Sequence, residues 1–162
     1  TVFAAKSIPD ELYARWLGPW RGPDGKPALL VRESDYALRS LQDLLLTSSG
    51  TATLENALLG LPMVVVYKLS WPTYWIARAL IRVPHIAMAN LLAGRALVPE
   101  LIQRDATPER IADAALALLS DPEALASLRR ELAGLRARLG GAGPIARAAG
   151  IILGKPAEKV AP

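Results

Sequence analysis

The chain has no cysteine, a single histidine and a single phenylalanine among its 162 residues. The lack of cysteine excludes disulfide bonds, thiolate nucleophiles and cysteine-based zinc sites, and one histidine, His85, cannot form a histidine-rich metal site. No uncharged run reaches the roughly 18 residues of a membrane-spanning helix; the longest are Asn56–Tyr67 and Val83–Gly94. The first residues show neither the basic start nor the long apolar stretch of a secretory signal peptide. Because the chain does not begin with methionine, we expect it to be a piece of a longer protein.

Apolar residues make up 52% of the chain and charged residues 21%, a composition that excludes intrinsic disorder. Alanine and leucine, with 28 residues each, favour helices. In contrast, 12 glycines and 13 prolines are too many for a simple helix bundle and indicate many turns. The net charge of +4 fits an anionic partner such as phosphate, nucleic acid or acidic lipid, without choosing among them.

Short apolar segments alternate with segments of helical character along the chain. The clearest strand is Pro62–Tyr67, because consecutive apolar residues, most of them β-branched, lie between a proline and a lysine. The other strand candidates are Val2–Ala5, Ala28–Val31, Asp43–Thr47 and His85–Met88. Continuous apolar strands that alternate with helices predict a parallel sheet covered on both faces. The predicted fold class is therefore α/β, with four or five strands and a helical C-terminal end.

Helix signals fill the intervals between these strands. Thr107 and Pro108 form a helix start, with the threonine as N-cap and the proline at the first helical position. Gly60 is placed to end a helix. After Asp121, leucines at helical spacing form one apolar stripe, which consists of Leu125, Leu128, Leu132, Leu135 and Leu139. Helices are expected at residues 10–17, 34–41, 52–59, 71–82, 98–103, 107–119, 121–139 and 145–153.

The first candidate site is the polar segment Thr47–Glu55, which follows a predicted strand and opens a helix. Open parallel sheets bind ligands at such junctions, and the free N–H groups and partial positive charge of a helix N-terminus favour phosphate. Gly50 permits close backbone approach, and Glu55 could accept hydrogen bonds from a ribose diol. Hydroxyl donors are available from Ser49, Thr51 and Thr53. The alternative is an ordinary capped helix start, and neither a P-loop nor a GxGxxG motif is present.

The second candidate is the segment Trp71–Arg82, which combines aromatic and basic residues. One face of the expected helix holds Trp71, Tyr74, Trp75, Arg78 and Arg82, and the opposite face holds Ile76, Leu80 and Val83. We expect the aliphatic face to pack on the sheet. The aromatic and basic face is typical of a lipid–water interface; the alternative buries the tryptophans and extends the arginines into solvent. A nucleic-acid surface would look similar, but no other part of the chain concentrates charge for it.

Further polar residues lie in largely apolar surroundings. Asn90 either caps a turn or presents its amide to a ligand. Glu100 and Gln103, three residues apart on one expected short helix, either reach the same cleft or face water. His85 opens a predicted strand and is interpreted as structural, because the sequence suggests no carboxylate or hydroxyl that would form a triad with it.

Five segments, taken together and in order, resemble the lipid-A-disaccharide synthase family. They are Ser48–Glu55, Pro62–Lys68, Thr73–Arg78, Asn90–Arg95 and Val98–Gln103. Each segment alone is weak evidence, but the order and spacing match the family from about residue 41 to 119. The match covers only the C-terminal half of a family member.

The resemblance implies a GT-B glycosyltransferase, in which two Rossmann-like domains face each other across a cleft and the C-terminal one holds the donor nucleotide. It implies transfer of 2,3-diacylglucosamine from its UDP donor to lipid X (2,3-diacylglucosamine 1-phosphate). The product is the β-1,6-linked lipid A disaccharide, the anomeric centre inverts, UDP is released, and no metal or other cofactor is needed. The expected location is the cytoplasmic face of the inner membrane of Gram-negative bacteria, as a peripheral protein. The expected partners are the two lipid-linked sugars and the membrane surface, not nucleic acid; a homo-oligomer is left open.

Residues of this chain that match the family's donor segment are Ser49, Gly50, Thr51, Thr53 and Glu55. Asn90 matches an asparagine of the donor cleft, and Glu100 and Gln103 match a polar helix that follows it. The segment Trp71–Arg82 also has a counterpart in the family, which favours membrane contact through Trp71, Tyr74, Trp75, Arg78 and Arg82. One departure is Met88-Ala89, where the family usually has Leu-Pro before the asparagine.

The resemblance also implies what lies outside this chain. Residues 1–154 would form the donor-binding domain without its first strand and its Gly-Ser-Arg loop, and residues 155–162 a loose tail. The general base and the acceptor site belong to the N-terminal half, so no catalytic residue is expected here and the chain alone should be inactive. Two alternatives stay open: the donor-binding half of another UDP-sugar GT-B enzyme, or a non-catalytic module that binds a membrane surface.

Overall fold

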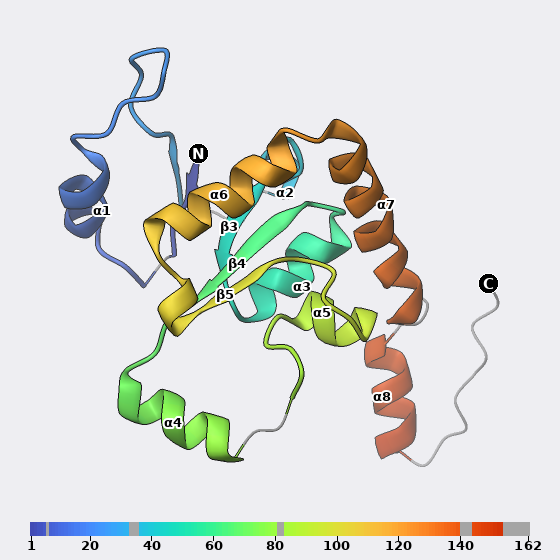
Figure 1. The fold of residues 1–162 in the computed structure, drawn as a ribbon. Helices are drawn as coiled ribbons and strands as arrows, with labels where there is room; N and C mark the ends of the chain where they lie inside the picture. Colours follow the sequence, from blue (N-terminus) through green and yellow to red (C-terminus); the bar gives the residue numbers. More distant parts are fainter. Residues whose placement is uncertain (6, 33–35, 81–82, 140–143, 154–162) are drawn as a thin grey trace. The chain divides into compact units, whose positions relative to one another are not determined.

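The computed structural model describes residues 1–5, 7–32, 36–80, 83–139 and 144–153 (Figure 1). Within these ranges the chain divides into two compact units, Thr1–Leu41 and Gln42–Pro162. The predicted tail at 155–162, the expected helix start at Ser34, and Arg82 lie outside the described residues.

The first unit contains a small parallel pair of strands and two helices. Strand β1 (Val2–Phe3) pairs with β2 (Leu30–Val31), with Val2 opposite Leu30. Helix α1 (Asp10–Leu17) follows β1, and α2 (Tyr36–Ser40) follows β2. The two strand candidates and the first helix predicted for this region are therefore confirmed.

One arginine ties the first unit together. Arg32 follows β2 and donates to the carbonyl oxygens of Ala5 at 3.2 Å and Ile8 at 2.8 Å. It also pairs with the carboxylate of Asp10, and its guanidinium carbon lies 5.1 Å from the centre of the Tyr13 ring. A planar guanidinium can make these contacts at once because its donors form a rigid fork and its face stacks on aromatic rings.

The second unit is built on a three-stranded parallel sheet in the order β3-β4-β5. Strand β3 (Leu45–Ser48) and strand β5 (Glu100–Ile102) flank the central strand β4 (Met63–Tyr67). Leu45 lies opposite Met63, and Val65 lies opposite Glu100. Of the five predicted strands, β4 matches its expected range most closely, because a continuous apolar run is what a strand buried on both faces requires.

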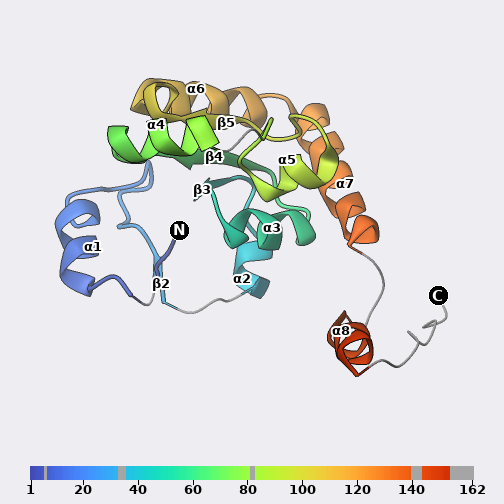
Figure 2. The ribbon, with the colours of Figure 1, turned by 90° about the horizontal axis from the view of Figure 1, so that it is seen from below.

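Helices cover both faces of this sheet. Figure 2 shows α6 on one face and α3 on the other. The helices of the second unit are α3 (Thr51–Leu58), α4 (Trp71–Leu80), α5 (Met88–Ala93), the 3₁₀ turn η1 (Gln103–Asp105), α6 (Pro108–Leu119), α7 (Pro122–Arg138) and α8 (Pro144–Ile152). This arrangement confirms the predicted Rossmann-like α/β class, with a helical C-terminal end.

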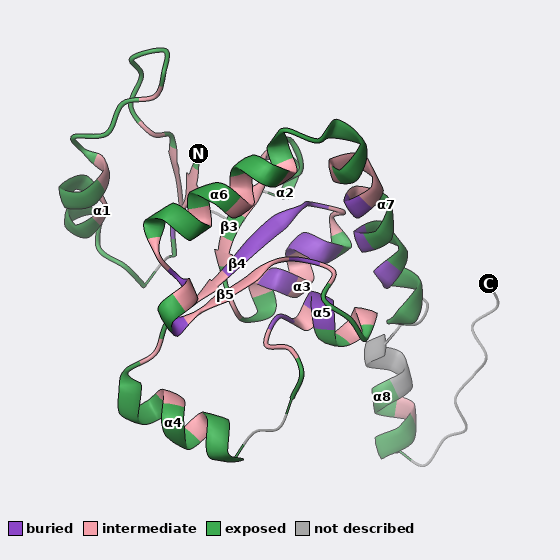
Figure 3. Ribbon diagram, in the orientation of Figure 1, coloured by how far each residue is buried: buried purple, intermediate pink, exposed green. Residues whose placement is uncertain are grey.

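The core of the second unit lies between β4 and the helices α3, α5 and α7. Met63 and Val65 of β4 are fully buried, as is Leu132 of α7 (Figure 3). The predicted leucine stripe on α7 supplies three core residues, Leu128, Leu132 and Leu135, whereas Leu139 at its end is partly exposed. Burial of such apolar side chains is the main force that holds the helices on the sheet.

Local sequence signals set several helix ends as expected. The hydroxyl of Thr107 accepts from the N–H of Arg110 at 3.3 Å, and Pro108 is the first residue of α6. The carboxylate of Asp121 accepts from Ala124 N–H at 2.9 Å and caps α7. Gly60 follows α3 with φ +67°, a left-handed conformation that glycine adopts without steric cost. These caps satisfy backbone groups that the helices themselves leave unpaired.

Two predicted elements are wrong. Residues 85–87 form no strand: Ile86 and Ala87 are bends, and α5 begins at Met88. The helix expected at 98–103 is instead strand β5 followed by η1, because Glu100–Ile102 pair with Val65–Tyr67 of the buried central strand. Pairing with a strand distant in sequence has overridden the local helical pattern.

The expected packing of α4 is also wrong. Its aliphatic side chains do not lie on the sheet: Ile76 is 61% exposed and Leu80 is 78% exposed, and the following Val83 is half exposed. Within Trp71–Leu80 no residue is buried. Amphipathic spacing identifies the helix and its apolar face, but it does not say what covers that face. In the described part of the chain, no helix is both long and apolar enough to cross a membrane.

The left-handed turn at Gly60 provides a test of the packing between α3 and α7. In Gly60→Ala, the new methyl group would be strained at φ +67° and would lie 3.4 Å from the carbonyl oxygen of Arg129. We expect a loss of about 1–2 kcal/mol in the free energy of unfolding, measured by urea denaturation.

Gly134 is the matched control, because a methyl group added there, inside α7, would meet no atom within 4 Å. Gly134→Ala should raise stability by about 0.5–1 kcal/mol, because alanine loses less backbone entropy than glycine in a helix. Equal stability of the Gly60→Ala variant and the wild-type chain would contradict this account of the turn.

Candidate functional site

The carboxyl ends of β3, β4 and β5 meet at one edge of the parallel sheet (Figure 1). Three connections leave from this edge: Ser49–Gly50 into α3, Lys68–Ser70 into α4, and η1 into α6. In open parallel sheets this is the edge at which ligands bind. The predicted polar segment around Gly50 therefore lies where such a site is expected.

Gly50 is the N-cap of α3 and supplies no side-chain cap. Its backbone has φ +151° and ψ −163°, a conformation that strains any residue with a Cβ, and a Cβ added there would meet no atom within 4 Å. The N–H of Thr53 donates to the Gly50 carbonyl at 3.1 Å. The two preceding N–H groups, of Thr51 and Ala52, belong to the first turn, which has no intrahelical acceptors. An anion could bind at this N-terminus.

Two further residues of the α3 start lie on its solvent side. Thr51 is exposed, and Glu55 is half-buried one turn further along the helix. Residues four apart lie on the same face of a helix. The Thr51 hydroxyl and the Glu55 carboxylate therefore lie on the same side of the first turns of α3.

Ser49 and Thr53 point elsewhere. The Ser49 hydroxyl donates to the Ile86 carbonyl at 3.2 Å. The Thr53 side chain is fully buried; its hydroxyl donates to the Gly50 carbonyl at 2.7 Å and accepts from Met88 N–H at 3.2 Å. Both hydroxyl groups thus bind the backbone around the start of α5.

Glu100 makes more hydrogen bonds around the start of α5 than Ser49 or Thr53 does. Its Oε2 accepts from Ile86 N–H at 2.9 Å, and its Oε1 accepts from Ala87 N–H at 3.0 Å and from the Asn90 amide at 2.7 Å. His85 Nδ1 lies 4.0 Å from Oε1, so the lone histidine has a carboxylate neighbour that the sequence does not reveal. The side chain is only 10% exposed. A carboxylate removed from water needs such hydrogen-bond donors, because burial without partners costs free energy.

Asn90 is completely buried within the second unit. Its Nδ2 donates to Val98 O at 2.9 Å as well as to Glu100, and its Oδ1 accepts from Leu97 and Val98 N–H, each at 2.8 Å. An amide side chain has two donor hydrogens and two acceptor lone pairs, and all four are occupied. Asn90 thus joins α5 to the entry of β5.

Gln103 lies just beyond β5 and is also buried, with φ +51°. Its Oε1 accepts from Leu69 N–H at 2.6 Å, and its Nε2 donates to Leu69 O at 3.1 Å. Glu100 and Gln103 therefore do not share a helix or a partner: Glu100 binds the start of α5, and Gln103 binds the connection that leads into α4.

Aromatic side chains cluster at the start of α4. The Tyr74 ring lies edge-on to Trp71, with centroids 5.9 Å apart, and to Trp75 at 5.7 Å. Arg104 of η1 lies over the Trp71 ring at 5.3 Å, a cation–π contact that the sequence analysis missed. The only sequence signal for this contact is a basic residue directly after Gln103. Arg78 is exposed on the same helix.

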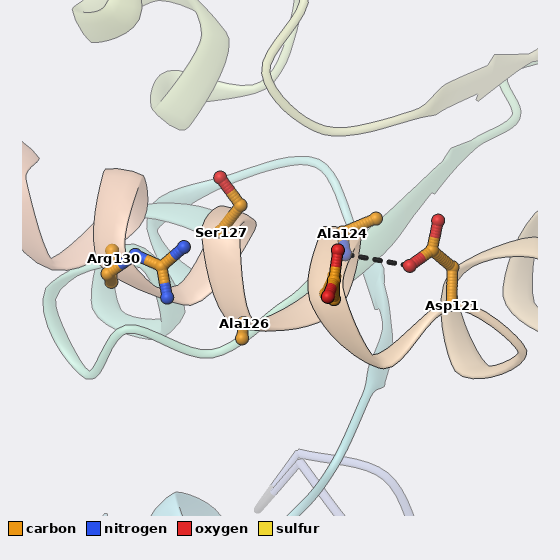
Figure 4. A pocket seen from close by; sticks show the side chains of 6 residues that line it. Asp121, Ala124, Ala126, Ser127 and Arg130 are labelled. Carbon is orange, nitrogen blue, oxygen red and sulfur yellow. Dashed lines mark hydrogen bonds between the residues drawn. The ribbon is translucent and has the colours of Figure 1, made fainter.

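A surface hollow on α7 is separate from these residues (Figure 4). It is lined by Asp121, Glu123, Ala124, Ala126, Ser127 and Arg130. Its aspartate already caps the helix through Ala124 N–H, and none of its lining residues belongs to the predicted site. Within the ranges that the structure describes, no group of three or more His, Asp or Glu side chains could hold a metal ion.

The fold and this edge define the class of the protein: a Rossmann-like domain of the kind that forms the C-terminal half of a GT-B glycosyltransferase. A family model described as lipid-A-disaccharide synthetase matches residues 27–137. The chain belongs to this family.

Several curated relatives agree with this assignment. The chain is 43% identical to the lipid-A-disaccharide synthase of Nitrosococcus oceani over 70% of its own length and 30% of the relative's. It is 47% identical to that of Syntrophus aciditrophicus, with 74% and 31% covered, and 42% identical to that of Geobacter metallireducens, with 85% and 36% covered. The chain thus spans about a third of the length of the curated relatives that it matches.

Proposed function

We propose that this chain is the donor-nucleotide-binding part of a lipid-A-disaccharide synthase, a glycosyltransferase of lipid A biosynthesis. The parent enzyme would transfer 2,3-diacylglucosamine from its UDP donor to lipid X and release UDP. The observation that carries the proposal is the family's match to residues 27–137, which includes the carboxyl edge of the sheet and the uncapped start of α3.

The reaction requires two things of the protein. The acceptor hydroxyl attacks the anomeric carbon from the face opposite UDP, so that the centre inverts while a base takes the hydroxyl proton. The bond between that carbon and the diphosphate breaks, and UDP leaves with the electron pair and needs positive partners. The start of α3 offers backbone N–H groups and a positive dipole end for the diphosphate.

We assign the donor site to the segment Ser49, Gly50, Thr51, Thr53 and Glu55, with Gln103 just beyond β5 and with Asn90 and Glu100 beside the start of α5. In this proposal Gly50 and Thr51 approach the diphosphate, and Glu55 accepts from the ribose hydroxyls. The base and the acceptor site would come from the two thirds of the relatives' length that this chain does not match. The chain alone would therefore bind UDP without catalysing transfer.

Gly50 gives the sharpest test of the donor site. Alanine at φ +151° would force the N-cap to change conformation and would displace the N–H groups of the first turn. In Gly50→Ala, we expect the Kd for UDP to rise about tenfold, measured from ¹⁵N–¹H correlation spectra of the labelled chain during a UDP titration.

The matched control is Gly25→Ala. Gly25 also has a left-handed φ, +74°, and open space around it, but it belongs to the first unit. This variant should bind UDP like the wild-type chain. If both variants bind UDP equally well, or if the wild-type peaks near Gly50 do not move, the assignment of the donor site is refuted.

We also propose that α4 rests on a membrane surface. Both of its faces are exposed, and Trp75, Ile76 and Leu80 are each at least 60% exposed. The sequence has no acidic residue between Glu55 and Glu100, whereas four basic residues fall in that interval. Exposed aromatic and aliphatic side chains beside cations are typical of a helix that lies in the interface of an anionic bilayer. The exposure of Trp75 argues against the alternative in which it is a core residue.

Replacement of three exposed apolar residues of α4 tests this contact. The triple variant Trp75→Ser, Ile76→Ser, Leu80→Ser should partition about tenfold less to vesicles that contain phosphatidylglycerol, measured by co-sedimentation. Binding of the wild-type chain should fall when phosphatidylglycerol is replaced by phosphatidylcholine, because the basic residues lose their anionic partners.

A control removes comparable exposed side chains from the first unit: Leu12→Ser, Trp16→Ser, Leu29→Ser. It should bind vesicles like the wild-type chain. Equal losses in both triple variants would mean that α4 has no special role.

A further inference from the structure

The segment Ile86–Met88, which ends at the first residue of α5, is held by side chains from other elements. Three consecutive N–H groups are each bound by a side-chain oxygen: Ile86 and Ala87 by Glu100, and Met88 by Thr53. The Ile86 carbonyl accepts from Ser49. The entry into α5 is therefore tied to β5 and to both sides of the Gly50 turn.

The side chains that make these contacts have little capacity left for a ligand. Asn90 is fully buried and has four protein partners. Thr53 is fully buried, and its hydroxyl both donates and accepts. Glu100 accepts three hydrogen bonds. A ligand that bound these groups directly would have to displace a protein partner and leave a buried polar atom unpaired.

Thr53 connects this network to the start of α3. Its hydroxyl donates to the Gly50 carbonyl at 2.7 Å, and its own N–H donates to the same oxygen at 3.1 Å. Through its bond with Met88 N–H, the same hydroxyl holds the neighbouring segment. One buried hydroxyl thus joins the Gly50 turn to Met88.

We infer that Thr53, Asn90 and Glu100 are positioning residues of the donor site: they hold segment 86–88 against the Gly50 turn and do not touch the nucleotide. Direct contact is left to the backbone at the start of α3 and to the exposed Thr51. This inference rests on the proposed function, because it concerns how the same site binds UDP. Sequence similarity assigns all these residues to the donor site, whereas this inference gives some of them contact with the nucleotide and others a positioning role.

The test compares amide exchange in the free chain with affinity for UDP. In Thr53→Val, which keeps the side-chain shape but removes the hydroxyl, hydrogen exchange at Met88 N–H should become about tenfold faster before any ligand is added. The Kd for UDP should rise at least about fivefold, because the turn is no longer held. Thr53→Ser retains the hydroxyl and should return both quantities to within about twofold of the wild-type values.

Thr51→Ala is the contrasting variant. Thr51 is exposed and is assigned direct contact, so this change should raise the Kd for UDP and leave exchange at residues 86–88 unchanged. Glu100→Gln is the second positioning variant and serves if Thr53→Val loses its peak dispersion. Replacing one carboxylate oxygen by a donor should speed exchange at Ile86 or Ala87 and weaken UDP binding.

Two results would overturn the inference. Weaker UDP binding with unchanged exchange at residues 86–88 would make Thr53 or Glu100 a direct contact. Faster exchange with unchanged UDP affinity would show that the segment is not part of the site. If the wild-type chain does not bind UDP, the proposed function itself fails and the positioning role fails with it; the variants' exchange rates then report only on the fold.

Discussion

The carboxylate of Glu100 at the start of β5 must find hydrogen-bond donors because it is almost completely removed from water. It takes them from the backbone of residues 86 and 87 and from the amide of Asn90, whose other three bonds fix the entry into β5. Without this arrangement the segment that meets Thr53 and Ser49 would be held from one side only. Burial of one carboxylate thus ties β5 to the backbone that lies beside the proposed donor site.

Where local chemistry decides the structure, the sequence was sufficient to predict it. The apolar run of β4 requires burial on both faces, Thr107 and Asp121 cap helices with their own side chains, and Gly60 ends α3 in a conformation that other residues resist. Residues 98–103 differ, because they become a strand only through pairing with β4. The same holds for residues 85–87, whose path is set by a glutamate that lies 13 to 14 residues further along the chain. Neither contact leaves a signal in a local window of sequence.

The candidate site shows the same division. The polar segment after a predicted strand was enough to identify five candidate residues, which are Ser49, Gly50, Thr51, Thr53 and Glu55. The structure gathers two of them, Ser49 and Thr53, into one hydrogen-bond network with Asn90 and Glu100. What the sequence could not show is the direction of each hydrogen bond, and hence which side chains are occupied by protein partners. Buried polar groups nearly always find such partners, so a polar residue in an apolar segment is as good a sign of internal architecture as of ligand binding. The contact between Arg104 and Trp71 was missed for a related reason: it joins two connections that meet only at the sheet edge.

Helix α4 joins the carboxyl edge of the sheet to a surface of exposed aromatic and aliphatic side chains. Its start is fixed by Gln103, whose amide forms two hydrogen bonds with the backbone of Leu69, and by Arg104 over the Trp71 ring. Beyond this attachment the helix is exposed on both faces. Gln103 follows β5 directly, so the residue just beyond the carboxyl end of this strand also holds the connection that leads into α4. If α4 rests on lipid, as proposed, the same attachment would keep the proposed donor site at a fixed distance from the bilayer. The proposed donor and acceptor both carry acyl chains and would require such a fixed distance. Their sugars must reach the nucleotide site while the acyl chains remain in an apolar environment.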